Sequence, residues 1–504
     1  MQFTSSDEPD ALDYEGLRKG SKKARFEDDA TEWSKFKKNS QTPADSVAET
    51  GSRERPKSDS SKVNTWLAKR GHAISFAGLF LFTVVLFFRP YELIPALSSL
   101  TSIAYYIGVF TLVVYVISQL AVEGNITAPL REVKLVGLLG VAALLSIPLA
   151  INAGEAWETF NEILIKALLI FIVLVNVVRT WTRLRLLIFV SLVVSIYLSV
   201  NAISDYQHGI FEIGKADLAR VGGSIGGLFK NSNDLALHLV TMVPIAFSLG
   251  LVTKGLLTRL LYWLAAGLMV AATIVTFSRG GFLGIVGVVL VFAYKFGRRN
   301  VVGTAAILIL AAVLFLTLAP GSYGGRLSTI FDSASDLTGS SSQRTQVLKR
   351  SVIVALRYPL FGVGIGNFHH RSFQELGTHN AYTQVASEIG IPAFVVYVLF
   401  ILYPLKRLRQ IEKATAGNDE ARRLYYLSIG LQGSIIGYMV SSFFDASAYQ
   451  WYVYYIVGYS ICMHRLFLIE TPGFAHVSWA RPFTKETKKA ERLEKAQAVS
   501  TSQV

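Results

Sequence analysis

Cysteine is almost absent from this sequence, and charged residues are scarce. The 504 residues include one cysteine, Cys462, which excludes an intrachain disulfide bond and any metal site built from several cysteines. Cys462 lies in an apolar stretch, so we interpret it as a small buried side chain. Only 17% of the residues are charged, whereas 52% are hydrophobic.

The hydrophobic residues come in long runs without a polar face. Two of them, "FAGLFLFTVVLFF" (76–88) and "AAILILAAVLFLTLA" (305–319), contain no charged residue. Such helices would expose apolar surface on every side in water, so they indicate membrane spans and argue against a large soluble enzyme. We predict an all-α polytopic membrane protein with about twelve transmembrane helices. The predicted spans are 74–95, 102–121, 134–151, 160–178, 184–203, 234–252, 259–276, 280–296, 301–319, 390–405, 426–444 and 450–468.

Polar segments flank the predicted spans. Residues 1–72 contain 14 Lys and Arg against 13 Asp and Glu. No apolar region follows within the first thirty residues, so this is not a secretory signal peptide. Low hydrophobicity with balanced charge is typical of a disordered tail. We therefore predict a disordered cytoplasmic tail over 1–72, a membrane domain over 73–469 and a second cytoplasmic tail over 470–504.

Lysine and arginine are distributed unevenly between the two sides of the predicted membrane domain. With the N-terminus in the cytoplasm, the cytoplasmic segments contain 37 of the 49 positive residues. Cytoplasmic loops of membrane proteins are enriched in Lys and Arg, so this count favours an even number of spans and two cytoplasmic termini. The formal net charge of +14 therefore reflects topology, and we predict no nucleic-acid partner.

The remaining positive residues gather where topology disfavours them. Most lie in two outer loops, 204–233 and 320–389, and one lies in a tight turn at Arg279. The second loop is about seventy residues long, and loops of that length are often functional. Its segment "SQRTQVLKRSVIVALRYP" (342–359) has apolar residues at Val347, Val352, Leu356 and neighbouring positions, which is consistent with an amphipathic helix.

The first cluster of candidate residues is "RVGGSIGGLFKNSNDLA" (220–236), a glycine-rich loop that leads into a span. Asn231, Ser232 or Asn233 could cap the helix, whose free N–H groups would face the outer side. A glycine-rich backbone before a helix can hold phosphate, and Arg220 and Lys230 would add positive charge. The competing interpretation is a flexible connection with an ordinary helix cap.

The second cluster is "TFSRGGFLG" (276–284), which places Arg279 between two spans. A charge at such depth is costly unless it is paired or faces a water-filled cavity, which favours a functional role. The alternative is an arginine that extends outward to the membrane surface.

The third cluster is "THNAYTQVASEIG" (378–390), which we predict as a short helix running to about Ile389. Thr378 or Asn380 would cap it. The helix dipole disfavours a charged imidazole at this end, so His379 suits a general base near neutral pH. Taken alone, a histidine in a polar turn is more often structural.

Two other motifs have weaker functional interpretations. "HHRSF" (369–373) has no carboxylate at a helical spacing from its histidines, so we predict no metal site. "GVGIGN" (362–367) does not follow a parallel strand, and we interpret it as a turn that lets backbones approach closely. The first outer loop (89–102) has one acidic residue, Glu92, which argues against a metal-dependent sugar transferase with catalytic carboxylates there.

Together, the three clusters resemble the O-antigen ligase superfamily of bacterial membrane glycosyltransferases, which includes O-antigen polymerases and protein O-oligosaccharyltransferases. The resemblance covers roughly residues 75–468 and includes the order of parts. It departs at Asn231-Ser232-Asn233, where the family usually has Asn-Pro-Asn. The resemblance implies a GT-C-like all-α fold in the bacterial inner membrane.

The resemblance also implies a reaction. The donor would be a glycan on undecaprenyl pyrophosphate, and the acceptor a hydroxyl of lipid A-core or another molecule. Arg220 and Arg279 would contact the pyrophosphate, His379 would act as the base, and displacement would invert the anomeric configuration without a metal or other cofactor. The further residues expected to bind substrate or to support the site are Arg344, Lys349, Arg350, Lys230, Asn231, Asn233 and Asn380. Asn380 and Glu388 would position the helix.

Three functions remain open at this stage. A ligase would transfer a finished glycan, and the single long outer loop favours it over a polymerase that joins lipid-linked repeat units. A transporter or flippase belongs to a different class. The sequence shows no internal repeat, and apart from Lys166 its spans are almost uncharged, which argues against transport.

Overall fold

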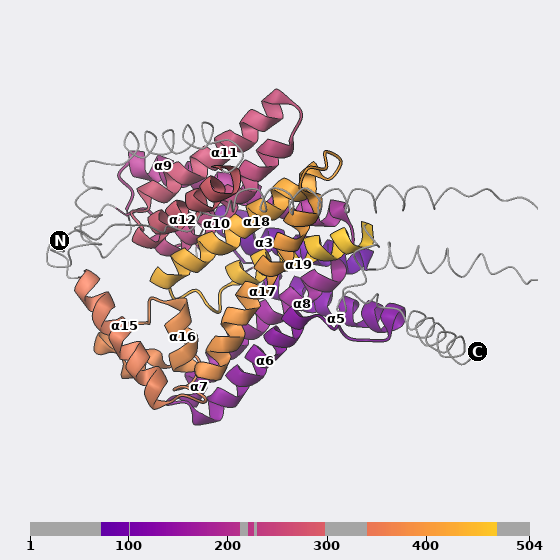
Figure 1. The fold of residues 1–504 in the computed structure, drawn as a ribbon. Helices are drawn as coiled ribbons and strands as arrows, with labels where there is room; N and C mark the ends of the chain where they lie inside the picture. Colours follow the sequence, from indigo (N-terminus) through magenta and orange to yellow (C-terminus); the bar gives the residue numbers. More distant parts are fainter. Residues whose placement is uncertain (1–71, 100, 212–219, 226–228, 298–339, 471–504) are drawn as a thin grey trace, which may run out of the picture. The chain divides into compact units, whose positions relative to one another are not determined.

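The computed structural model describes residues 72–99, 101–211, 220–225, 229–297 and 340–470, and every structural statement below concerns these residues. They form helices joined by turns and loops, without strands (Figure 1). The first helices are α3 (Ala73–Phe88), α4 (Pro90–Leu93), α5 (Ile103–Glu123), α6 (Arg131–Ser146), α7 (Ala153–Thr159), α8 (Ile165–Val177) and α9 (Trp181–Gln207). Then follow α10 (Ser232–Val252), α11 (Leu256–Val275), α12 (Arg279–Gly297), α15 (Ser340–Arg357), α16 (Ala381–Glu388), α17 (Ile391–Thr415), α18 (Arg422–Ser441) and α19 (Trp451–Glu470).

Eleven helices in the described part of the chain are long and apolar enough to cross a membrane. They correspond to eleven of the twelve predicted spans. The twelfth, 301–319, lies outside the described residues, as do both predicted tails and residues 320–339 of the long loop. The prediction of an all-α, multi-pass membrane protein is therefore confirmed. The orientation of the termini stays a prediction.

Helices α10, α18 and α19 form the centre of the bundle. α10 packs against α11 and α18, and α18 also packs against α12 and α17 (Figure 1). α5 lies at the periphery and leaves Tyr106, Phe110 and Ile117 more than half exposed. Apolar side chains on the outside of a spanning helix contact lipid in a bilayer, so this exposure agrees with the membrane assignment.

Ion pairs join the helices at the end predicted to be cytoplasmic. Arg179 contacts Glu123 at 2.5 Å, Arg407 contacts Glu132 at 2.8 Å, and Lys295 contacts Glu412 at 2.5 Å. Each pair connects segments that are separate in sequence; Arg179 lies in the connection between α8 and α9, and the other residues lie in helices. The pairing satisfies charges that would be costly to bury alone.

The opposite end carries two helices that are not membrane spans, α15 and α16. α15 packs against α16, and α16 packs against α17 (Figure 1). Val347 and Val354 are buried on one side of α15, whereas Val352 and Leu356 are exposed on the other. The segment forms the predicted helix with one buried side, but Val352 and Leu356, two of the apolar residues on which the prediction rested, do not belong to that side.

Candidate active site

The first and second sequence clusters meet at one buried asparagine, Asn233. Arg220 is only 2% exposed, and its Nη2 donates a hydrogen bond to Asn233 Oδ1 at 2.8 Å. Ser278 Oγ donates to the same oxygen at 3.0 Å. Arg220 Nε also donates to the Thr276 carbonyl at 3.4 Å. The glycine-rich loop and the Ser-Arg turn are therefore parts of one hydrogen-bonded unit.

Both clusters lie at helix starts. Asn231 caps α10, because its Oδ1 accepts the Asn233 N–H at 2.9 Å. Ser278 Oγ accepts the Gly281 N–H at 3.2 Å at the beginning of α12. These bonds satisfy backbone donors that have no partner within the helix. The cap predicted among residues 231–233 is thus Asn231, whereas Asn233 faces Arg220.

The two glycines after Arg279 allow close packing at this helix start. A Cβ on Gly280 would lie 2.8 Å from Phe444 Cβ, and one on Gly281 would lie 2.7 Å from Ala236 Cβ. Side chains could not fit there without movement of their neighbours. Arg279 itself is the first residue of α12 and is half-buried. The "SRGG" motif therefore lets α12 start directly against α10 and the end of α18.

The third cluster forms the short helix that the sequence predicted, α16. Asn380 is its cap, with Oδ1 accepting the N–H groups of Tyr382 and Thr383 at 2.9 Å each. His379 precedes the cap, is half-buried, and has a φ of 49°. A non-glycine residue in this left-handed region is uncommon, and such positions occur preferentially at functional sites.

The end of α18 and the following turn, η7 (Ser442–Phe444), connect the second and third clusters. Ser441 Oγ donates to the Gly280 carbonyl at 3.1 Å. Asn380 Nδ2 donates to the Phe443 carbonyl at 3.0 Å. All three clusters are therefore linked through hydrogen bonds at one end of the bundle.

A pair of acidic residues in this region was not predicted from the sequence. Asp445 is buried, and the side chain of Asp234 is close enough to influence its pKa. Burial raises the pKa of Asp445, while hydrogen bonding with Asp234 and the charges of Arg344 and Arg220 oppose the rise. Asp445 therefore lies within the electrostatic influence of an arginine from each of two separate segments. The sequence signal for Asp445 is an aspartate directly after an apolar span.

The other predicted residues are placed differently. Arg344 is half-buried on α15, close enough to Asp445 to influence its titration. Lys230 and Asn231 are exposed beside the start of α10. Lys349 and Arg350 are exposed on α15, and Arg350 Nε donates to the Arg371 carbonyl at 2.7 Å. The structure brings Arg344 toward the other clusters but does not bring Lys349 or Arg350 there.

Glu388 anchors the last turn of α16. Its Oε2 accepts hydrogen bonds from the Gly366 N–H and the Tyr449 hydroxyl, both at 2.9 Å. Gly362, Gly364 and Gly366 have positive φ values, and the backbone of Gly362 approaches that of Glu388 closely. The prediction that "GVGIGN" forms a turn for close backbone approach is confirmed.

The protonation of Glu388 should make folding stability depend on pH. Burial raises the pKa of Glu388 from 4.5 to about 7. A raised carboxyl pKa means that its stabilising contribution is fully present below about pH 4.5 and is lost as the pH rises through about 7. We expect wild-type protein to lose about 3 kcal/mol between these limits, and Glu388→Gln to lose much less. Thermal unfolding at pH 5 and pH 8 tests this; equal losses in both proteins would contradict it.

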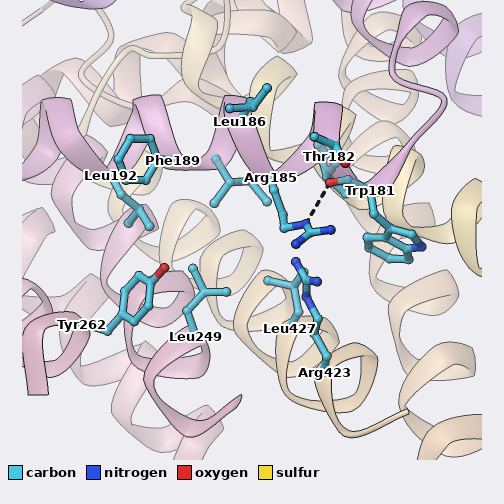
Figure 2. Close-up of a pocket in the computed structure, with 12 residues that line it drawn as sticks. Trp181, Thr182, Arg185, Leu186, Phe189, Leu192, Leu249, Tyr262, Arg423 and Leu427 are labelled. Atoms are coloured by element: carbon cyan, nitrogen blue, oxygen red, sulfur yellow. Dashed lines mark hydrogen bonds between the residues drawn. The ribbon is translucent and has the colours of Figure 1, made fainter. Parts of the chain in front are cut away.

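A separate cavity of about 380 Å³ opens between α9, α10, α11 and α18 (Figure 2). Figure 2 shows the guanidinium groups of Arg185 and Arg423 close together among apolar side chains, and Arg185 Nε donates to the Trp181 carbonyl at 3.3 Å. Arg423 lies in the first turn of α18, whereas the candidate site adjoins its last turn. None of the predicted site residues lines this cavity.

Comparison with known proteins points to the same region of the chain. Residues 264–398 match the family model described as O-antigen ligase. This segment contains Arg279, Arg344 and His379. Arg220 lies before it and is connected to it by the bond to Thr276 and, through Asn233, to Ser278. No curated protein matches the chain. Residues 264–398 of this multi-pass membrane protein are therefore similar to the O-antigen ligase family.

Proposed function

We propose that the protein transfers an oligosaccharide or polysaccharide from undecaprenyl pyrophosphate to an acceptor hydroxyl at the outer face of the bacterial inner membrane. Both termini would be cytoplasmic. The observation that carries the proposal is the bond network around Asn233, which joins the Arg220 loop to the Ser278-Arg279 turn. Through η7, the same unit reaches the cap of the His379 helix.

Arg220 and Arg279 are proposed to bind the pyrophosphate of the donor. Guanidinium groups can contact phosphate oxygens through two parallel hydrogen bonds and stabilise the charge that develops as the sugar–phosphate bond breaks. Arg220 is held by Asn233 and Thr276 before any donor binds, so little reorganisation is needed. Arg344 on α15, which is close enough to Asp445 to influence its pKa, would contribute further positive charge.

The Asp234–Asp445 pair is proposed to tune the charge of this arginine group. A hydrogen bond between two carboxyl groups requires a proton on at least one of them. The pair then carries less negative charge than two separate carboxylates, so it cancels less of the positive potential by which the arginines attract an anionic donor. Ionisation of both carboxyls would weaken that attraction.

His379 is proposed to accept the proton of the acceptor hydroxyl. The acceptor oxygen forms a bond to the anomeric carbon, the bond from that carbon to the pyrophosphate oxygen breaks, and the proton passes to the imidazole. Undecaprenyl pyrophosphate leaves as an anion held by the arginines, so the transfer inverts the anomeric configuration. Pyrophosphate is already a good leaving group, and the reaction needs no metal ion.

Ligase and polymerase activities would use the same residues, so a genetic experiment must separate them. Deletion of the gene should leave full-length polymer on the carrier lipid if the protein is a ligase. Single lipid-linked repeat units would accumulate if it is a polymerase. We expect the ligase pattern, restored by the wild-type gene and not by His379→Ala. A glycan profile unchanged by deletion would contradict both activities.

A further inference from the structure

Two histidines and one glutamate converge outside the network that joins the three clusters. Glu155 lies in the first turn of α7, and His369 and His370 lie in the turn η5 (Phe368–Arg371). Glu155 Oε2 is 2.8 Å from His370 Nε2 and 3.5 Å from His369 Nε2. One ligand atom from each of the three residues lies within 4.8 Å of the other two.

The ring of His369 is oriented by a backbone carbonyl. His369 Nδ1 is 3.0 Å from the Gly366 carbonyl oxygen, which can only accept, so Nδ1 carries the hydrogen. In the neutral ring, the lone pair is therefore on Nε2, which faces Glu155. Metal-binding histidines typically donate their other ring N–H to a carbonyl or carboxylate in this way. Gly366 is itself held in place by its N–H bond to Glu388.

We propose that Glu155, His369 and His370 bind a divalent transition-metal ion, with Zn²⁺ as the best-matched species. A tetrahedral zinc ion with bonds of about 2.0–2.1 Å separates its ligand atoms by about 3.4 Å. The two observed separations from Glu155, 2.8 and 3.5 Å, lie on either side of that value. Imidazole and carboxylate ligands favour zinc over Ca²⁺ and Mg²⁺, which prefer oxygen. The three side chains are 29–40% exposed, so an ion can reach them from solvent.

The bound ion would fasten the α6–α7 connection to the loop that supports α16. Direct hydrogen bonds already join these parts: the Asn152 N–H donates to Asn367 Oδ1 at 2.6 Å, and the Ile151 N–H donates to the Val363 carbonyl at 3.1 Å. Metal bonds between Glu155 and the two histidines would strengthen this junction. The ion would hold the loop and take no part in the transfer chemistry, so the proposal stands apart from the proposed reaction.

Metal binding can be measured on the full-length protein in detergent, without a histidine tag and after treatment with a chelator. Calorimetric titration with ZnCl₂ should show one binding site per chain. Elemental analysis after desalting should show one zinc ion per chain. Thermal unfolding should move to higher temperature with zinc and stay unchanged with MgCl₂. Glu155→Gln should weaken zinc binding at least tenfold, and combined His369→Ala and His370→Ala should abolish it.

His208→Ala is the matched control, because His208 is an exposed histidine outside the group. It should bind zinc like the wild type. Glu155→Gln keeps a similar shape, and its elution in size-exclusion chromatography reports whether folding is intact. Failure of the wild type to retain zinc, or equal zinc content in all variants, would overturn the site. Zinc binding without a rise in unfolding temperature would overturn its role in holding the loop.

Discussion

His379→Ala should lower the rate of glycan transfer by about 10²–10⁴-fold, the usual effect of removing a general base. The acceptor hydroxyl would then have no group to take its proton during attack. Arg279→Ala should lower the rate by about 10²–10³-fold, because the charge of the leaving pyrophosphate would lose a stabilising partner. Transfer is measured with purified protein and with lipid-linked glycan extracted from the deletion strain.

Two controls keep this result interpretable. His208→Ala removes another histidine outside the proposed site, and Arg357→Ala removes an exposed arginine on α15. Both should keep near-normal activity. All variants must insert and accumulate to similar levels, which immunoblots of membrane fractions establish. Near-normal transfer by His379→Ala and Arg279→Ala would refute the proposed mechanism.

Replacing Arg220 or Asn233 should also lower the rate of glycan transfer, and the effects of the two substitutions should not be additive. Arg220→Ala removes a guanidinium group proposed to bind phosphate, with an expected loss of about 10²–10³-fold. Asn233→Ala leaves that group without the acceptor that holds it at 2.8 Å, so we expect a smaller loss of about tenfold or more. In the Arg220→Ala background, Asn233→Ala should have little further effect.

The double-mutant cycle separates positioning from simple damage to the fold. Arg220→Lys keeps the charge but loses the fork that can bind donor and Asn233 together, so it should restore only part of the activity. Lys254→Ala is the control, because Lys254 is an exposed cation outside the three clusters. Independent, multiplicative losses for Arg220→Ala and Asn233→Ala would mean that the bond between them does not position the arginine.

Several features of the candidate site were predictable because their signals are local. The start of α16 follows from the capping preference of Asn380, and the start of α10 from that of Asn231. The three glycines of "GVGIGN" indicate positive φ and close approach within a few residues. Such signals depend on neighbouring residues, so one stretch of sequence contains them.

The features of the site that the sequence did not predict depend on contacts between distant segments. Asp445 meets Asp234 across more than two hundred residues, and no spacing pattern predicts that carboxyl pair. The prediction of no metal site considered only carboxylates that are close to His369 and His370 along the sequence. Glu155 approaches them from a different helix.

By itself, the sequence determined that the chain crosses the membrane repeatedly as helices, because long apolar runs cannot remain in water and must satisfy their backbone hydrogen bonds internally. It also indicated three polar clusters through local capping, glycine and charge patterns. Only the tertiary structure decided how they combine. Asn233 joins Arg220 to Ser278, and the end of α18 together with η7 joins Gly280 to Asn380. Packing of α10, α12 and α18 brings these ends together. Buried polar groups need partners, and folding selects those partners in space rather than along the chain.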